Sequence, residues 1–109
     1  AAHFKLNNLT AIIDNNNLQQ TGSNEEIMST KNLSEKWKSF NWDVKEIDGH
    51  DVTQILEALK ANSDKPKLIL ANTVKGKGFS FSENNNDWHH KIMKQKQYEE
   101  ALKELDASK

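Results

Sequence analysis

An unbroken apolar run, Leu68 to Ala71, lies just after Pro66, the only proline in the chain. A strand that is apolar at every position is typical of a parallel sheet covered on both faces, because a strand with one exposed face alternates apolar and polar residues. A second short apolar run, residues 9–13, ends at Asp14 and three asparagines, and residues 43–48, with Val44 and Ile47, have the pattern of a short strand that ends at Asp48 and Gly49. We therefore expect three parallel strands at residues 9–13, 43–48 and 67–71, the first of them buried.

Helical patterns alternate with these runs. After Asp51, a candidate N-cap, apolar residues recur at i, i+3, i+4 and i+7, which predicts an amphipathic helix to about residue 61; they are Val52, Ile55, Leu56 and Leu59. Asn32 followed by Glu35 predicts a second helix opened by a capping box. Its aromatic face places Trp37, Phe40 and the nearby Trp42 in the core.

Residues 74–86 have the composition of an extended loop, and a last helix is expected where apolar residues return at helical spacing, at Tyr98, Ala101, Leu102 and Leu105. Strands that alternate with helices predict an α/β fold, a three-layer parallel sheet with flanking helices. A length of 109 residues fits one compact unit.

Composition excludes several functions. The charges, 15 basic and 16 acidic, nearly cancel, and every basic residue is lysine, so we expect no nucleic-acid partner. The chain has no cysteine, which excludes disulfides and thiolate chemistry. No apolar run approaches the roughly 18 residues of a membrane span, so we expect no membrane partner and a cytoplasmic protein.

In an open parallel sheet, ligands bind at the carboxyl ends of the strands. The loop after the first expected strand carries Asp14, three asparagines and Gly22. The loop after the third carries Lys75, two glycines and then Trp88 and His89. We expect these two loops to meet and to form the site.

These segments resemble the later part of the thiamine-diphosphate-binding domain of transketolases, above all the separate N-terminal subunit of two-chain bacterial transketolases. The resemblance covers nearly the whole chain and rests on residues 1–6, 14–22, 44–51, 73–78 and 88–89. The family's cofactor motif begins with Gly-Asp-Gly and ends in an asparagine segment. Only the asparagine half is present, so residues 1–109 are expected to be the C-terminal part of that domain.

The resemblance implies thiamine diphosphate and Mg²⁺ as cofactors. Counted back from Gly22, Asn16 matches the family's metal-ligating amide, and Leu18 matches the residue whose backbone carbonyl is the next ligand. Mg²⁺ prefers oxygen donors of this kind. Asparagine runs are also common in turns, which is the simpler interpretation. Asn17 stands where the family often has glycine, and asparagine tolerates positive φ well.

The same resemblance makes Lys75 a cofactor-side lysine, although such a lysine is ordinarily only solvated. His89 matches the histidine that contacts the cofactor diphosphate and the donor sugar. The resemblance therefore implies that His89 is the catalytic residue. Lys91 matches a basic position near the sugar phosphate. His90 replaces a family glycine, and if that position requires positive φ the cost is about 1–2 kcal/mol.

The resemblance implies a transferase of carbohydrate metabolism and the pentose phosphate pathway, which moves a two-carbon ketol unit between sugar phosphates. The expected partners are sugar phosphates and a complementary transketolase subunit that carries the pyrimidine-binding domain, in a homo- or hetero-oligomer. The partial chain alone is expected to be inactive. Two alternatives remain open: another thiamine-dependent enzyme such as deoxyxylulose-phosphate synthase, and a non-catalytic assembly domain.

Overall fold

The computed structural model describes residues 1–107. They fall into two compact units, one made of residues 1–16 and 29–73 and the other of residues 17–28 with the segment from Val74 onward. The sequence favours a single unit. The structure differs because residues 17–28 leave the path of the sheet and form a small hairpin and helix of their own.

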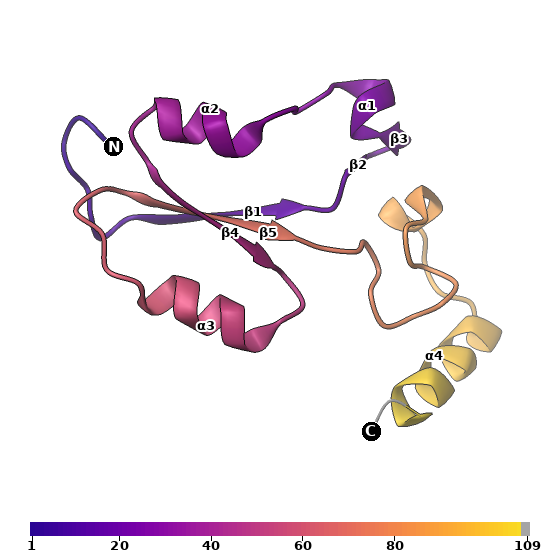
Figure 1. Cartoon of the computed structure of the whole chain (residues 1–109). Helices are drawn as coiled ribbons and strands as arrows, with labels where there is room; N and C mark the ends of the chain where they lie inside the picture. The colour runs from indigo at the N-terminus through magenta and orange to yellow at the C-terminus, as the bar shows by residue number, and fades with distance from the viewer. Residues whose placement is uncertain (108–109) are drawn as a thin grey trace. The chain divides into compact units, whose positions relative to one another are not determined.

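The first unit is built on a three-stranded parallel sheet (Figure 1). Its strands are β1 (Thr10–Asn15), β4 (Asp43–Asp48) and β5 (Lys67–Asn72), and β5 lies between the other two. In register, Ile69 of β5 is opposite Ile12 of β1 on one side and Lys45 of β4 on the other. The three expected strands and their parallel pairing are confirmed.

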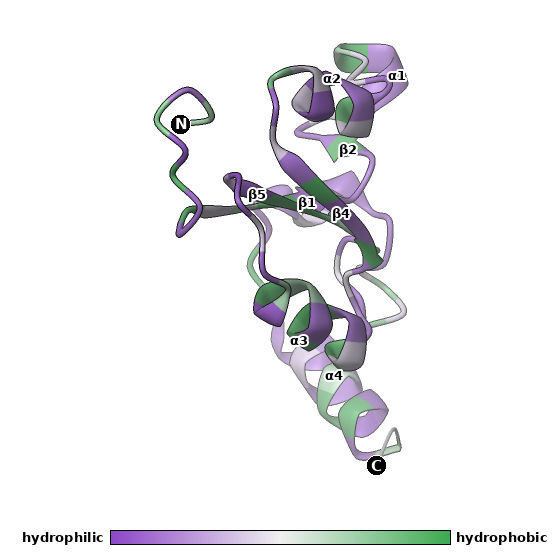
Figure 2. Cartoon of the chain, turned by 60° about the vertical axis from the view of Figure 1, so that its left-hand side comes forward, coloured by the Kyte–Doolittle hydropathy of each residue, from purple (hydrophilic) through white to green (hydrophobic). Residues whose placement is uncertain are grey.

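Two helices cover opposite sides of this sheet, as Figure 1 shows: α2 (Leu33–Ser39) and α3 (Val52–Lys60). The core between α3 and the sheet consists of Ile47, Ala58, Ile69 and Ala71, with Ile55 packed against it. Figure 2 shows hydrophobic stretches in β4 and β5, and it shows that α3 carries both hydrophobic and hydrophilic residues. The α/β class is therefore confirmed.

A buried lysine joins the central strand to α3. Lys67 is only 5% exposed, and its Nζ donates hydrogen bonds to the carbonyl oxygens of Ala58 and Leu59, at 2.8 and 2.9 Å. The last carbonyls of a helix have no partner within the helix, and a cation there also complements the helix dipole. This contact fixes the C-terminal end of α3 against β5.

The expectation that the first strand is buried is wrong. In β1 the residues alternate between exposed and half-buried, and Ile12 is 61% exposed. Among the described residues β1 pairs only with β5 and forms an edge of the sheet. The pattern of a strand buried along nearly its whole length belongs to the central strand, β5.

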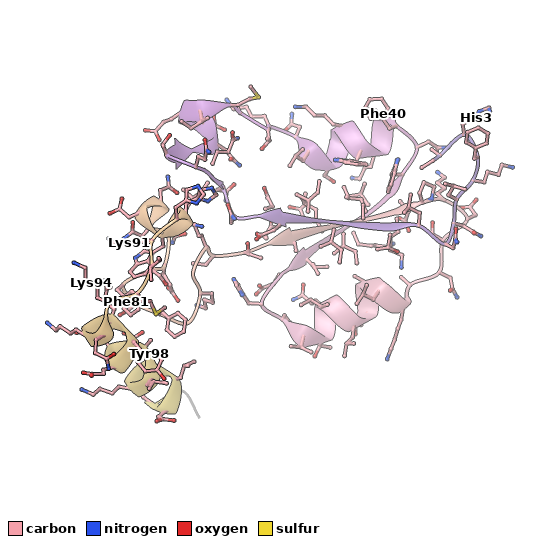
Figure 3. The ribbon with its side chains drawn as sticks, turned by 180° about the vertical axis from the view of Figure 1, so that it is seen from behind. His3, Phe40, Phe81, Lys91, Lys94 and Tyr98 are labelled. Carbon is pink, nitrogen blue, oxygen red and sulfur yellow. The ribbon has the colours of Figure 1, made fainter. Side chains whose placement is uncertain are left out.

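Two expectations for α2 are also wrong. Asn32 has φ +57 and makes no side-chain capping bond, while Glu35 forms an ion pair with Lys38 at 2.7 Å instead of returning to the cap. Phe40 is 72% exposed and projects away from the sheet in Figure 3. The helix ends at Ser39, so helical spacing no longer sets the direction of Phe40. Trp37 and Trp42 are half-buried and pack edge to face, with ring centroids 4.8 Å apart.

The second unit contains short elements and one long helix. The strands β2 (Leu18–Gln19) and β3 (Gly22–Ser23) pair antiparallel and lead into α1 (Asn24–Ile27). A 3₁₀ turn, η1 (Asn86–His89), precedes α4 (Gln95–Ala107), which confirms the last helix. None of the helices in residues 1–107 combines the length and apolarity needed to cross a bilayer.

Candidate functional site

Hydrogen bonds between polar side chains connect the carboxyl ends of the three parallel strands. Asn15 Nδ2 of β1 donates to Asn72 Oδ1 of β5 at 2.7 Å, and Asn72 Nδ2 donates to Glu46 Oε1 of β4 at 3.2 Å. Thr73 Oγ1 donates to Asp14 Oδ1 beside them. These bonds hold the end of β1 immediately before Asn16. Sequence reasoning missed them because they depend on the register that sets Asn15 opposite Asn72.

The segment after Asn16 turns sharply. Asn17 has φ +60, in the left-handed region that asparagine tolerates, and its carbonyl oxygen accepts from Asn24 N at 2.9 Å. Ser23 and Glu26 form a capping box that starts α1. Hydrogen bonds from the Ser23 backbone and hydroxyl lower the pKa of the Glu26 carboxyl. The Ser-x-x-Glu pattern was the signal for this cap in the sequence.

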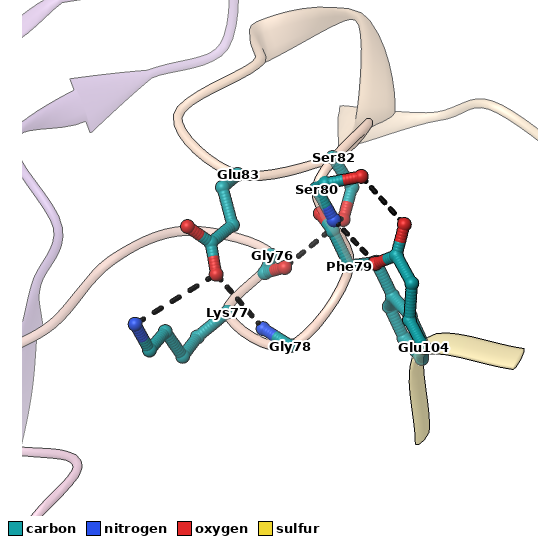
Figure 4. A network of polar contacts seen from close by, with 8 residues as sticks. All are labelled: Gly76, Lys77, Gly78, Phe79, Ser80, Ser82, Glu83 and Glu104. Carbon is teal, nitrogen blue, oxygen red and sulfur yellow. Dashed lines mark hydrogen bonds and ion pairs between the residues drawn. The ribbon is translucent and has the colours of Figure 1, made fainter. Parts of the chain in front are cut away.

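The loop after β5 is folded on itself by backbone and serine contacts (Figure 4). Gly76 has φ +70, and its carbonyl oxygen accepts from Ser82 Oγ at 3.0 Å. A β-carbon at Gly76 would lie 2.5 Å from the Ser82 carbonyl oxygen, so the close approach requires glycine. The carbonyl oxygen of Lys75 accepts from Asn84 N at 2.9 Å, which closes the loop. The segment carrying Lys75 is thus a defined turn.

Two carboxylates secure the same loop (Figure 4). Glu83 accepts from Gly78 N at 3.1 Å and lies 3.8 Å from Lys77 Nζ. Glu104 of α4 accepts from the Ser80 hydroxyl and backbone N–H, at 2.5 and 2.7 Å. Both bonds, that from the hydroxyl foremost, lower the pKa of Glu104. The last helix therefore holds the loop through Ser80.

Aromatic packing positions η1. Trp88 Nε1 donates to the Phe81 carbonyl oxygen at 3.0 Å, and the two rings lie 5.1 Å apart. Asn85 caps the turn by accepting from Asp87 N at 3.0 Å. His89, the last residue of η1, follows directly from this anchored tryptophan. The asparagines at residues 84–86 therefore do more than form a loop, since Asn85 caps η1.

A polar pocket of about 420 Å³ lies within the second unit. It is lined by Gln20, Thr21, Asn86, Asp87, His89 and His90. Gln20 and Thr21 come from the turn between β2 and β3, and the other four come from η1 and its end. The segment after the first strand and the segment after the third both line this pocket, and of the expected site residues the lining includes His89 alone. Residues 1–107 contain no group of three or more His, Cys, Asp or Glu side chains that could hold a metal ion.

Residues 1–107 match the family model for the thiamine diphosphate binding domain of transketolase. The chain belongs to this family. It is 41% identical over 105 residues to one of the subunits of the apulose-4-phosphate transketolase of Phocaeicola vulgatus, in an alignment that covers 94% of this chain and 37% of that protein.

Solved structures agree with the family match. A transketolase from Campylobacter jejuni has 26% identity and a TM-score of 0.86, over 97% of this chain and 17% of that one. A mutant transketolase from Pichia stipitis, in complex with fructose 6-phosphate, has 28% identity and a TM-score of 0.84, over 96% of this chain and 16% of that one. The transketolase domain seen here therefore spans well under half of the relatives that it matches.

In this transketolase domain the expected site residues have the following positions. Asn16 follows β1 and is half-buried, and Leu18 lies in β2. Lys75 is half-buried in the loop after β5, whereas His89 is exposed and lines the pocket. Lys91 Nζ lies 3.7 Å from Asp87 Oδ2 and 5.3 Å from the centre of the Trp88 ring.

His90 carries no backbone strain. Its φ is −132° and its ψ is 12°, values outside the left-handed region that favours glycine. The cost of about 1–2 kcal/mol that a positive φ would impose on a histidine is therefore absent. The His90 side chain is part of the pocket lining.

Proposed function

We propose that this chain is the C-terminal part of the diphosphate-binding domain of a transketolase, which transfers a two-carbon ketol unit between sugar phosphates with thiamine diphosphate and Mg²⁺. The observation that carries the proposal is the family match over residues 1–107 together with the polar pocket beside His89. The relative from Phocaeicola vulgatus is itself named as one subunit of a transketolase, which supports a complementary chain that carries the pyrimidine-binding domain.

The residues after β1 suit the metal. The side-chain amide of Asn16 and the backbone carbonyl of Leu18 are neutral oxygen donors, which Mg²⁺ prefers, and diphosphate oxygens would complete its shell. Asn17 between them takes the left-handed conformation that turns the chain. We assign Asn16 and Leu18 as metal ligands on this chemistry and on the resemblance.

The remaining roles follow from the side chains. Bound thiamine diphosphate would supply the carbon nucleophile and the electron sink for carbon–carbon cleavage. His89 would donate a hydrogen bond to a diphosphate oxygen through one ring nitrogen and accept one from a hydroxyl group of the donor sugar through the other, because neutral imidazole carries one donor and one acceptor. Lys75 would face the cofactor, and Lys91 would be a basic group near the sugar phosphate.

The test is Asn16→Ala in the complete assembled enzyme. We expect the Mg²⁺ concentration needed for half-maximal activity to rise by at least about 10- to 100-fold, since losing even an outer-shell partner of a metal ligand costs that much. Calorimetric titration with thiamine diphosphate and Mg²⁺, together with the transfer assay, measures this.

Asn15→Ala is the matched control, since the Asn15 side chain bonds Asn72 and is assigned no metal role. Because that bond helps to hold the strand end before Asn16, we expect the Mg²⁺ requirement of Asn15→Ala to rise far less than that of Asn16→Ala. If Asn15→Ala raised the requirement and Asn16→Ala did not, the metal ligand would be misplaced by one residue. If Asn16→Ala kept full metal-dependent activity, Asn16 would not be a metal ligand and the assembly-domain alternative would be favoured. A wild type that is active without metal would refute the Mg²⁺ assignment.

A further inference from the structure

Two adjacent imidazoles line the same pocket. The rings of His89 and His90 pack edge to face, with centroids 4.3 Å apart and planes at 72°. Both residues are exposed and both belong to the pocket lining. Each ring therefore limits the orientations open to the other, and each can present nitrogen atoms to a ligand.

The pocket has the chemistry of a site for a polyhydroxylated ligand. Gln20, Thr21 and Asn86 provide neutral donors and acceptors, which match hydroxyl groups that both donate and accept. The carboxylate of the lining, Asp87, is paired with Lys91 at 3.7 Å, so its charge is partly balanced. The volume of about 420 Å³ lies within the range of roughly 300–1,000 Å³ for small-molecule sites.

His90 is better placed than Lys91 to contact a ligand in this pocket. The Lys91 ammonium pairs with Asp87 and lies over the Trp88 ring, whereas His90 is itself part of the lining. The ring is held on one side by its edge-to-face contact with His89. A side chain positioned in advance loses little conformational freedom on binding.

We propose that His90 is a substrate-binding residue that hydrogen-bonds the hydroxylated carbon chain of the donor sugar and so sets sugar preference. This rests on the proposed function, because that function brings a sugar phosphate to the pocket. The contact is made to hydroxyl groups and not to the phosphate, since the lining includes a carboxylate, that of Asp87, and no lysine.

The experiment compares His90→Phe and His90→Gln in the assembled enzyme, loaded with thiamine diphosphate and Mg²⁺. Phenylalanine keeps a ring against His89 but cannot hydrogen-bond, whereas glutamine keeps a donor and an acceptor. With fructose 6-phosphate or apulose 4-phosphate as donor, we expect His90→Phe to raise KM about tenfold, the effect of losing one good hydrogen bond, with little change in kcat. His90→Gln should recover much of the loss.

Inorganic phosphate, used as a competitive inhibitor, separates the two possible contacts. We expect its inhibition constant to be unchanged in His90→Phe, because the phosphate is not the group that His90 binds. A weaker inhibition in proportion to the rise in KM would overturn the assignment to hydroxyl groups. His50→Phe, a change at an exposed histidine of the first unit, is the control and should leave KM unaltered.

These measurements distinguish a failure of the inference about His90 from a failure of the proposed function. If His90→Phe keeps the wild-type KM, His90 only packs against His89 and the inference is wrong, although the proposed function stands. Equal losses in His90→Phe and His90→Gln would also reject it, since hydrogen bonding would not explain them. If the wild type transfers a two-carbon unit from neither donor, the proposed function fails for these sugars and the inference fails with it.

Discussion

Gly49 lies in the turn between β4 and α3, where a β-carbon has no room. It would lie 2.4 Å from Thr73 Cγ2, 3.1 Å from Ala71 Cβ and 3.2 Å from the Asn72 carbonyl oxygen. The Thr73 hydroxyl is bonded to Asp14, so the methyl group cannot rotate away without breaking that bond. We expect Gly49→Ala to lower the free energy of unfolding by about 1–3 kcal/mol, the usual cost of overpacking, as measured by urea titration.

A second substitution checks the cause. Thr73→Ser removes the obstructing methyl group and keeps the hydroxyl for Asp14, so it should restore part of the stability lost in Gly49→Ala. Gly22→Ala is a matched control, because its β-carbon would meet only side-chain atoms of Ile27 and Glu26, at 3.2–3.3 Å. If Gly22→Ala destabilised as much as Gly49→Ala, steric crowding at Thr73 would not be the reason.

Some residues of the candidate site could be predicted from the sequence, and others could not. The positive φ of Asn17 could be expected from its type, and His89 could be chosen from its sequence motif. Gln20 could not, because its role in the pocket depends on a two-residue hairpin turn that brings it to η1. The Asn15 to Asn72 bond needed the register of two strands, since the two residues lie 57 positions apart in the chain.

At the scale of elements, α3 is the helix whose start was specified best by sequence. Asp51 accepts hydrogen bonds from Thr53 N at 2.8 Å, Gln54 N at 3.3 Å and Gln54 Nε2 at 2.9 Å. These bonds, led by that from the Gln54 side chain, lower the pKa of Asp51 below its usual 3.8. Because the folded-state pKa is the lower one, the stabilisation is complete above pH 3.8 and is lost as pH falls through the folded-state value.

We expect Asp51→Ala to lower Tm by a few degrees at neutral pH, because the N-cap bonds are lost. Asp51→Asn should keep most of the stability at neutral pH, since asparagine caps about as well, but should lose this contribution to the acid dependence. Thermal unfolding followed by circular dichroism from neutral pH down to about pH 2.5, well below the usual aspartate pKa, checks both. An Asp51→Asn variant with the same acid profile as the wild type would show that another group titrates.

Other features of the elements could not be read from the sequence, for local reasons. The amphipathic stripe of α3 located the helix, yet Ala58 and Ile55 face the core while Val52 and Leu56 are 67% and 47% exposed. A small residue lets the helix approach the sheet closely, and larger residues to its sides stay out of the contact. The expected capping box at Asn32 failed because that residue took a left-handed conformation, which a residue pattern does not reveal.

For the whole molecule, the parallel sheet was predictable because an unbroken apolar strand requires cover on both sides. The partition into two units was not, because it depends on contacts between segments far apart in the chain. The exposure of large apolar side chains was also hidden from the sequence; Phe4, Ile12 and Phe40 are 76%, 61% and 72% exposed. Such surface is consistent with a chain that spans only 37% of its relative's length.

This partial length leads to the last prediction, for residues 1–109 prepared alone. On the proposed assignment the chain supplies two oxygen donors, from Asn16 and Leu18, whereas Mg²⁺ demands an octahedral shell. We expect the isolated chain to bind thiamine diphosphate with Mg²⁺ more weakly than micromolar in calorimetric titration and to show no transfer activity. The full-length assembled enzyme is the control and should bind tightly. Micromolar or tighter binding by the isolated chain would mean that these residues form a complete cofactor site, and the proposal that residues 1–109 are only part of the diphosphate-binding domain would have to be abandoned.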